Sequence, residues 1–503
     1  MLDYILSNDD LRILQQKSRK TYIKLQLLNE KFKPVNELKG VITNGDLNIT
    51  TSSMIRRTCN FTIHLNKDSI YLLREKQLWF TSILKIYIGF YDYHRKNIHY
   101  YDCGTYIMDK INTSVIGDSS ALKIDCLDLM GLFTKEHRGQ IIGAKTIKFP
   151  MGYNIRKALI DFIALYGITN YYIEEIGIYY EVETDNTFPY DLEFSGDTCG
   201  YDIIEKIVGL YPYYEAFFDG TTFICKRIQT KVSDPVILTH EVFSKYIISE
   251  NVDYQINDIY NIVEIWGNDI DYDRFSSNVS MSENKYSVIF GDDIQPSANV
   301  KYAIMLSDTN VEEPMMQING SSFCYIVNPD GTSIPKGHLE KDNVYVFKYL
   351  NNKFYLQGSA IVHSIALLLS NHPTDAQKKI YEEKFNCKNI SYTIEPYSNF
   401  TVEKIGEKKI QKTGDEYDNI TSDYLCFERA KYDLYKCSKL VDTIGLEMRY
   451  MPFLSVGHKV EYKPVFENKE NQYLLTDISI NISDGIASTM NVNMTRFYNF
   501  YDI

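Results

Sequence analysis

The chain has 503 residues, of which 44% are hydrophobic, so it is long enough for two to four domains and apolar enough to give them cores. Its formal charge of −13 argues against a surface built to neutralise nucleic-acid phosphates. Nine scattered cysteines without a Cys-x-x-Cys pair predict buried free thiols, made in a reducing cytoplasm. Acidic residues interrupt the first dozen positions, which argues against a signal peptide, and the longest apolar run, Ala360 to Leu369, is too short to span a bilayer.

The first 142 residues predict a helical arm followed by an antiparallel β domain. Residues 7–17 form a short capped helix, and residues 1–19 are assigned to an arm that packs either on a neighbouring subunit or on its own chain. From Thr21 the apolar residues recur with period two, in six or so strands joined by short turns, one of them at Asn44-Gly45. Residues 20–142 are therefore predicted to form a first β-barrel-like domain.

Residues 143–237 predict an α/β module. Asn154 is expected to cap a helix that ends near Gly167, and a second helix is expected from Tyr201 to Leu210. Asp219-Gly220 then stands between two apolar runs, which is a strong signal for a hairpin because glycine accepts a positive φ.

Residues 238–300 and 400–503 are predicted to form a second antiparallel β-barrel-like domain, separate from the first. Within it a helix begins at Asp423, and a closing hairpin turns at Asp484-Gly485. Between these two segments, residues 301–399 are expected to hold a small β-lobe and helices at 360–370 and 374–385, whereas the polar stretch 268–308 predicts a loop. The predicted fold class is mainly β: two antiparallel β-barrel-like bodies, an intervening α/β module and an inserted small β-lobe.

No catalytic residue, cofactor site or metal site is predicted. Dinucleotide and phosphate loops, zinc-peptidase motifs and nucleophile elbows do not occur in the sequence. His94 and His99 are interpreted as exposed hairpin residues. The run Asp269 to Asp273 imitates the start of a calcium loop, but Arg274 replaces the glycine and Ser280 the glutamate that such a loop requires, so a solvated acidic turn is favoured.

The remaining charge clusters are interpreted as solvated surface, because adjacent carboxylates in a strand point to opposite faces. They are the acidic pairs Glu174-Glu175, Glu382-Glu383 and Asp125 with Asp128, and the basic pairs Arg56-Arg57, Lys378-Lys379 and Lys408-Lys409.

Several strings resemble the hub or tail-tip proteins found at the end of the tail tube in tailed bacteriophages and related contractile particles, the group of the late control protein D. They lie near both ends of the chain: Ile55 to Cys59, Ile124 to Asp128, Asn399 to Gly406, Glu428 to Ala430 and Met494 to Tyr498. The resemblance covers most of the chain except about 268–357.

This resemblance implies a structural hub protein of the virion tail tip or baseplate, made in the bacterial host cytoplasm. It would be a homotrimer around an open channel, in which two β-bodies per chain give six similar units that match a six-fold tail tube. Its partners would be the tail tube or distal tail protein, the tip or spike protein, the tape-measure protein and DNA that passes without specific binding. An enzyme is not expected. The alternatives are a tail-associated cell-wall hydrolase and a carbohydrate-binding receptor protein.

Overall fold

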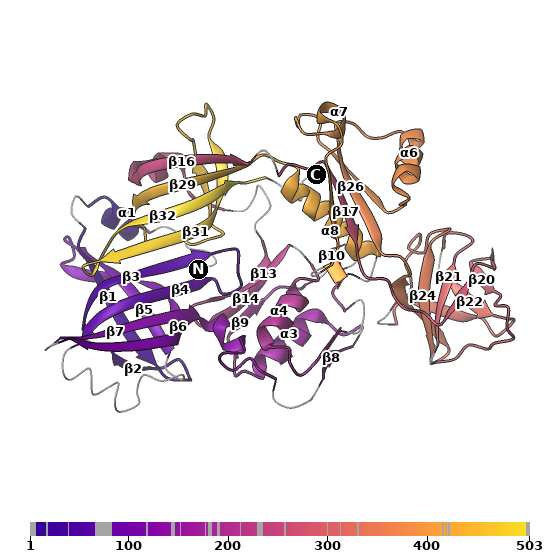
Figure 1. The fold of residues 1–503 in the computed structure, drawn as a ribbon, viewed down its shortest axis with the longest axis horizontal. Coiled ribbons are helices and arrows are strands. Elements are labelled where there is room, and N and C mark those ends of the chain that lie inside the picture. The colour runs from indigo at the N-terminus through magenta and orange to yellow at the C-terminus, as the bar shows by residue number, and fades with distance from the viewer. Residues whose placement is uncertain are drawn as a thin grey trace.

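The computed structural model describes residues 7–498 apart from 17–18, 39, 66–82, 117–118, 142–145, 151, 177, 180–183, 189–191, 212, 229–234, 256–257, 299, 312, 329–330, 415–416, 419 and 421–422. The fold is mainly β, as the sequence predicts. Figure 1 shows a large sheet at one end of the molecule, an α/β module and a second layer of strands and helices in the middle, and a small β-lobe at the far end.

A 13-stranded sheet brings the two ends of the chain together. Its order is β16-β29-β32-β31-β3-β4-β7-β6-β5-β1-β2, and β30 and β15 branch from β31. The N-terminal strands are β1 (Thr21–Leu28), β2 (Pro34–Glu37), β3 (Gly40–Thr50), β4 (Arg57–Leu65), β5 (Ile83–Asp92), β6 (Asn97–Ile116) and β7 (Ser119–Asp128). The others are β15 (Val236–Leu238), β16 (Ile247–Gln255), β29 (Val441–Arg449), β30 (Lys459–Tyr462), β31 (Asn471–Ser483) and β32 (Ile486–Arg496).

The two β-bodies are not separate, which corrects the sequence prediction. Strand β3 pairs antiparallel with β31, and a single hydrophobic core includes Phe61 from the first body and Met490 from the second. Within the sheet all pairs are antiparallel except β15 with β30. Pairing between distant strands such as β3 and β31 leaves no local signal in the sequence. The alternation of apolar and polar residues therefore predicted two sheets, whereas the chain forms one.

The predicted turn at Asn44-Gly45 is also wrong, because β3 runs through it without a break. Gly45 lies so close to β4 that a Cβ there would stand 2.4 Å from the backbone oxygen of Asn60. The glycine therefore permits close approach of two strands and does not reverse the chain. By contrast, the Asp484-Gly485 turn between β31 and β32 is confirmed, with φ values of 50° and 73°.

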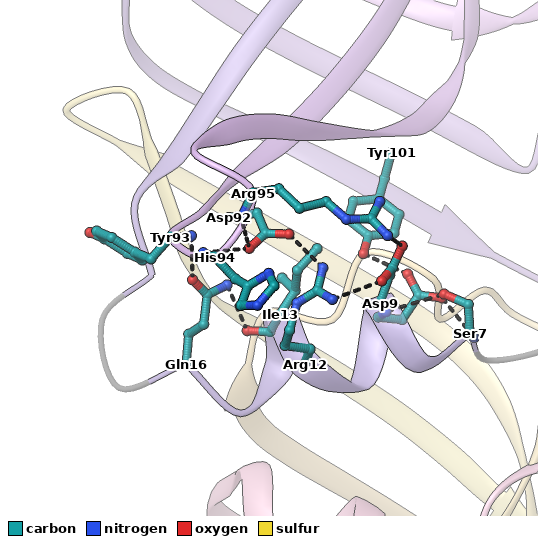
Figure 2. Close-up of polar contacts among 11 residues, drawn as sticks. Ser7, Asp9, Arg12, Ile13, Gln16, Asp92, Tyr93, His94, Arg95 and Tyr101 are labelled. Carbon is teal, nitrogen blue, oxygen red and sulfur yellow. Dashed lines mark hydrogen bonds and ion pairs between the residues drawn. The ribbon is translucent and has the colours of Figure 1, made fainter.

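The short helix α1 (Asn8–Leu14) packs on its own chain, against the turn between β5 and β6 (Figure 2). Tyr101 donates a hydrogen bond from its hydroxyl to Asp10 at 2.6 Å, and the Arg12 guanidinium lies 2.6 Å from the Asp92 carboxylate. The apolar side of α1, Ile13 with its neighbour Leu14, joins the core of the large sheet.

The α/β module follows the predicted order of helices and hairpin. Asn154 caps α3, accepting the backbone N–H of Lys157 at 2.8 Å, and β13 and β14 pair across the Asp219-Gly220 turn. Its elements are η1 (Leu129–Phe133), β8 (Ile147–Phe149), α3 (Ile155–Ala164), β9 (Tyr171–Ile173), β10 (Ile178–Tyr179), β11 (Thr184–Asp185), β12 (Leu192–Phe194), α4 (Gly200–Val208), β13 (Tyr214–Asp219) and β14 (Thr222–Arg227).

A four-stranded sheet in the middle of the molecule corrects two further predictions. Residues 262–266 form one of its strands and do not belong to the second β-body, and residues 363–369 are a strand where the sequence predicts a helix. Both faces of that strand are buried, Leu368 towards the core under α8 and Leu367 towards the core under α6. A strand that is buried on both faces has no alternation of apolar and polar residues. Its sequence therefore has the same continuous apolar pattern as a buried helix.

The elements of this middle region and of the short connection before β16 are β17 (Ile262–Trp266), β26 (His363–Leu369), α6 (Asp375–Phe385), β27 (Ile390–Ile394), α7 (Val402–Ile405), β28 (Lys409–Lys412), α8 (Asp423–Cys437), α5 (His240–Phe243) and η2 (Ser244–Tyr246). Helix α8 begins at the predicted residue, Asp423, whose carboxylate accepts a hydrogen bond from the Ser359 hydroxyl.

The inserted lobe begins earlier than residue 301, because the stretch predicted to be a loop contains four of its strands. The lobe has its own eight-stranded sheet and its own core around Tyr286, Ile304 and Phe347. Its strands are β18 (Arg274–Ser276), β19 (Val279–Ser282), β20 (Lys285–Val288), β21 (Lys301–Met305), β22 (Met315–Ile318), β23 (Cys324–Val327), β24 (Val344–Leu350) and β25 (Lys353–Ser359). The division of the whole chain into domains stays a prediction.

Candidate functional site

The outer face of four adjacent strands in the large sheet is uniformly polar. Successive residues of a strand point to opposite faces, so the core residues Leu47, Phe61, Ile480 and Val492 leave their neighbours on the side away from the core. These neighbours, which we term the polar sheet face, are Asn491 and Asn493 on β32; Asp477, Ser479, Asn481 and Ser483 on β31; Asn44, Asp46, Asn48 and Thr50 on β3; and Thr58, Asn60 and Thr62 on β4.

The polar sheet face crosses the junction between the two halves of the chain. In one row, Asn491, Ser479, Asn48 and Thr58 stand opposite one another on four successive strands. In the next row, Asp477 faces Thr50, whose hydroxyl donates to the Asp477 carboxylate at 2.7 Å. Side chains that bond across strands in this way hold their neighbours in place, so the face is ordered and spans both halves.

Its charge is weakly negative. Asp46 and Asp477 are its charged members, and none of its residues is Lys or Arg. On the two flanking strands, Glu447 on β29 and Asp125 on β7 continue two of the rows, and Lys123 on β7, opposite Thr62, continues a third. Because affinity for nucleic acid depends on cations that neutralise phosphates, a duplex beside this face finds polar contacts without an attractive charge.

The carboxylates examined as acid and base pairs have structural partners. Asp125 lies beside the polar sheet face, whereas Asp128 is buried, caps η1 and accepts the backbone N–H of Arg57 at 2.9 Å. Burial raises the pKa of Asp128 to about 6. Glu174 accepts the backbone N–H of Arg227 at 3.0 Å. The structure does not bring these groups together around a common cavity.

The remaining predicted candidates also serve local structure. In the imitation calcium loop, Asp269 accepts the backbone N–H of Val362 at 3.3 Å and Asp273 that of Lys301 at 2.8 Å. His99 packs its ring against Tyr101, with centroids 4.7 Å apart. In the described residues no group of three or more His, Cys, Asp or Glu side chains is placed to hold a metal ion.

The pair Arg56-Arg57 is buried, which corrects its interpretation as a solvated face. Arg56 forms an ion pair with Glu215, and the Arg57 guanidinium lies 3.3 Å from the Asp219 carboxylate. Both acids come from the β13–β14 hairpin, so the arginines fix the α/β module to the large sheet. Local sequence patterns do not indicate this burial, because both partners are about 160 residues away along the chain.

The cysteines are free, as predicted, and six of the nine are buried. Burial raises the pKa of Cys103 to about 11 and that of Cys387 to about 12, so both stay protonated near neutral pH. Within the described ranges, no helix combines the length and the apolar composition that crossing a bilayer requires.

The polar sheet face was not predicted from the sequence. Its signal was nevertheless present: the alternation at 44–50, 477–483 and 491–493 places Asn, Asp, Ser or Thr at each outward position. What the sequence lacked was the register that sets these three stretches and β4 side by side.

Comparison with known families and structures gives three findings. A family model described as a domain of unknown function (DUF5048) matches residues 397–501, about a fifth of the chain. No curated protein matches the sequence. Solved structures with a similar fold include a tail protein from Neisseria meningitidis MC58, with a TM-score of 0.46 and 9% identity over 94% of this chain and 96% of that one.

Two further structures are similar. One is the 43 kDa tail protein of prophage MuSo2 from Shewanella oneidensis, with a TM-score of 0.45 and 7% identity over 94% of this chain and 98% of that one. The other is the prophage tail protein gp18 from Listeria monocytogenes EGD-e, with a TM-score of 0.42 and 9% identity over 94% of each chain. These three structures are tail proteins, the class that the sequence resemblance indicates, and other similar structures include a PdpA-VgrG complex from Francisella. At these scores the likeness does not by itself assign a role.

Proposed function

We propose that this chain is a structural hub protein at the distal end of the tail of a phage or phage-like particle, where three copies form a ring around an open channel. The observation that carries the proposal is the polar sheet face, which crosses from one half of the chain to the other without a Lys or Arg. The strings that resemble hub proteins lie in the same two halves, at Ile55 to Cys59, Ile124 to Asp128 and Met494 to Tyr498.

The continuous sheet supports a ring of three. Each chain contributes the two halves of one continuous sheet, so three chains present six halves to a six-fold tube. A closed ring needs an interface between two different surfaces of neighbouring copies. The sheet has two such surfaces, its end strands β2 and β16, which expose Val35 at 62% and Ile248 at 54%. Exposed edge strands are natural docking sites for another chain, because their backbone N–H and C=O groups are unpaired on one side.

The polar sheet face is assigned to the channel wall. A wall that carried lysines and arginines would hold passing DNA by its phosphates, whereas Asn, Ser, Thr and a few carboxylates give a wetted surface that repels DNA weakly. The proposed ring therefore lets DNA pass while the phage enters its host. The partners in this role are the tail tube or distal tail protein, the tip or spike protein and the tape-measure protein, all within the virion.

A structural role, and not an enzymatic one, is proposed because Asp128 and Glu174, two of the carboxylates considered as catalytic candidates, accept backbone N–H groups, and Glu215 forms an ion pair with Arg56. A zymogram with host cell walls and the pure protein tests this part. We expect no clearing. Clearing that a single carboxylate substitution abolishes would favour the alternative of a cell-wall hydrolase.

Electron cryomicroscopy of the intact particle, with this chain tagged, tests the ring itself. We expect three copies at the distal end of the tail tube, with Asn48 and Asn491 facing the lumen. Six copies of the chain, or a lumen lined by lysine and arginine, would contradict the proposal.

A further inference from the structure

The inserted lobe lies at the far end of the molecule from the large sheet (Figure 1). Two neighbouring clefts lie on this lobe. The first has a volume of about 570 Å³ and the second about 450 Å³. Both values fall in the range of small-molecule sites, roughly 300–1,000 Å³. The proposed hub role does not use this lobe.

Three adjacent strands form the floor of the first cleft. Lys285 on β20 stands opposite Met315 on β22, which stands opposite Tyr325 on β23. The three side chains therefore project from the same face of the sheet. Tyr325 is 48% exposed, so part of its ring is open to solvent beside the apolar Met315.

An unpaired amide donor lines the same cleft. Asn284 is only 9% exposed, and its Nδ2 has no hydrogen-bond partner among the described residues. Its Oδ1 accepts the backbone N–H of Val311 at 3.1 Å, which fixes the orientation of the amide. The backbone at Asn284 is left-handed, with φ of 61°, which holds the residue at the turn between β19 and β20. A buried donor without a partner costs free energy unless a ligand or water accepts its hydrogen bond.

The charges around the cleft balance. Glu283 and Glu313 supply carboxylate acceptors, and Lys285 and Lys336 supply ammonium donors. The Ser333 hydroxyl donates to Glu313 at 2.6 Å, which holds one of the carboxylates in place. A lining of two acids and two bases favours neither an anionic nor a cationic ligand. It suits a neutral molecule whose groups both donate and accept hydrogen bonds, which is the character of a sugar hydroxyl.

We propose that the first cleft binds a neutral oligosaccharide, with a sugar ring against Tyr325 and Met315 and with its hydroxyls bonded to Asn284, Glu283 and Lys336. Carbon–hydrogen faces of sugars are apolar, so a half-exposed aromatic ring beside polar groups supplies both kinds of contact. The lobe then attaches the particle to a glycan on the cell surface.

The second cleft extends the site along the same two strands. Ser287 and Gln317 follow Lys285 and Met315 at the next outward positions of β20 and β22, and the Gln317 amide donates to the Ser287 hydroxyl at 2.8 Å. Polar side chains thus continue from one cleft to the other, which fits a chain of several sugar units better than a single monosaccharide.

A glycan array probed with the full-length protein tests the proposal, with neutral oligosaccharides, sialylated oligosaccharides and polyglycerol phosphate as the probes. We expect a neutral oligosaccharide to bind, and calorimetry with that oligosaccharide then gives its affinity. Tyr325→Ala and Asn284→Asp are expected to weaken the affinity about tenfold each. Aspartate tolerates the left-handed backbone at 284, so N284D changes the donor and preserves the fold.

Tyr272→Ala is the matched control, because Tyr272 is also 48% exposed but does not line either cleft. Its affinity is expected to stay within about twofold of the unmodified protein, and circular dichroism checks that all variants fold. The proposal fails if no neutral oligosaccharide binds, if only the anionic probes bind, or if Y325A and N284D bind as tightly as Y272A.

Discussion

The Ser479 hydroxyl donates a hydrogen bond to the Asn48 side-chain oxygen at 2.7 Å, across the strand pair that joins the two ends of the chain. The two residues are 431 positions apart, yet they are direct neighbours on the polar sheet face. This contact lies at the centre of the surface assigned to the channel wall, so it is the place where a change of charge is most informative.

Lysines at Asn48, Ser479 and Asn491 are expected to slow the release of DNA from otherwise intact particles. Each added cation neutralises a phosphate of DNA that passes beside it, so retention should also weaken as salt rises, by roughly one unit of log K per unit of log salt for each contact. DNA release after receptor triggering is measured with a DNA-binding dye at several salt concentrations.

The control for that experiment carries the same added charge elsewhere, as lysines at the exposed residues Asn371, Gln377 and Asn468. Its release rate is expected to equal that of the unmodified particle. Equal release rates for both triple variants would show that the polar sheet face does not line the channel.

Gly485→Ala, in the turn of the closing hairpin, is expected to lower the free energy of unfolding more than Gly457→Ala does. Both glycines have a positive φ, 73° and 79°, so both substitutions carry the left-handed backbone cost of about 1–2 kcal/mol. At Gly485 a Cβ would additionally stand 2.9 Å from the backbone oxygen of Ile42, whereas nothing lies within 4 Å at Gly457. Urea unfolding measures both losses. Equal losses would mean that the contact with Ile42 relaxes without cost.

Local signals explain which parts of the fold could be predicted from the sequence. The hairpins at Asp219-Gly220 and Asp484-Gly485 and the helix capped by Asn154 depend on residues within a few positions, and all three are present. The failures have a different cause. The turn expected at Asn44-Gly45 and the helix expected at 360–370 were overridden by strands from distant parts of the chain, which local patterns do not record.

The two candidate surfaces illustrate the same limit. The outward Asn and Ser residues of the polar sheet face were visible as alternation, but their alignment depends on the pairing of β3 with β31. The lobe cleft was not predictable at all, because Asn284, Met315 and Tyr325 meet only through parallel pairing of β20 with β22 and antiparallel pairing of β22 with β23.

Arg57→Ala is expected to lower the free energy of unfolding by about 3 kcal/mol, because removing one partner of a buried ion pair leaves the other charge uncompensated. The Arg57 guanidinium also donates to the backbone oxygen of Phe218 at 3.2 Å, so the contact between the large sheet and the α/β module loses two partners. Chemical denaturation gives the value.

Arg95→Ala is the control for Arg57→Ala. The Arg95 side chain is 52% exposed in its ion pair with Asp9, and exposed pairs contribute less than about 1 kcal/mol. Similar losses for both variants would indicate that the Arg57 pair is as well solvated as the surface pair.

The contribution of Asp423, at the start of α8, to the stability of the protein is expected to fall as pH rises from about 4 to about 7. Burial raises the pKa of this carboxyl from 3.8 to about 7, with the nearby acids Glu340 and Asp269 adding to the shift. The folded state therefore holds a proton that the unfolded state has released, so the contribution of Asp423 is complete below about pH 4 and is lost as pH rises through about 7.

Asp423→Asn keeps an acceptor for the Ser359 hydroxyl without a charge to bury, and its stability should depend less on pH. We expect the variant to be more stable than the unmodified protein at pH 8, by roughly 2–4 kcal/mol, and nearly equal to it at pH 4. Thermal unfolding at the two pH values makes the comparison, and an identical pH dependence for both proteins would show that Asp423 is ionised and well solvated in the folded state.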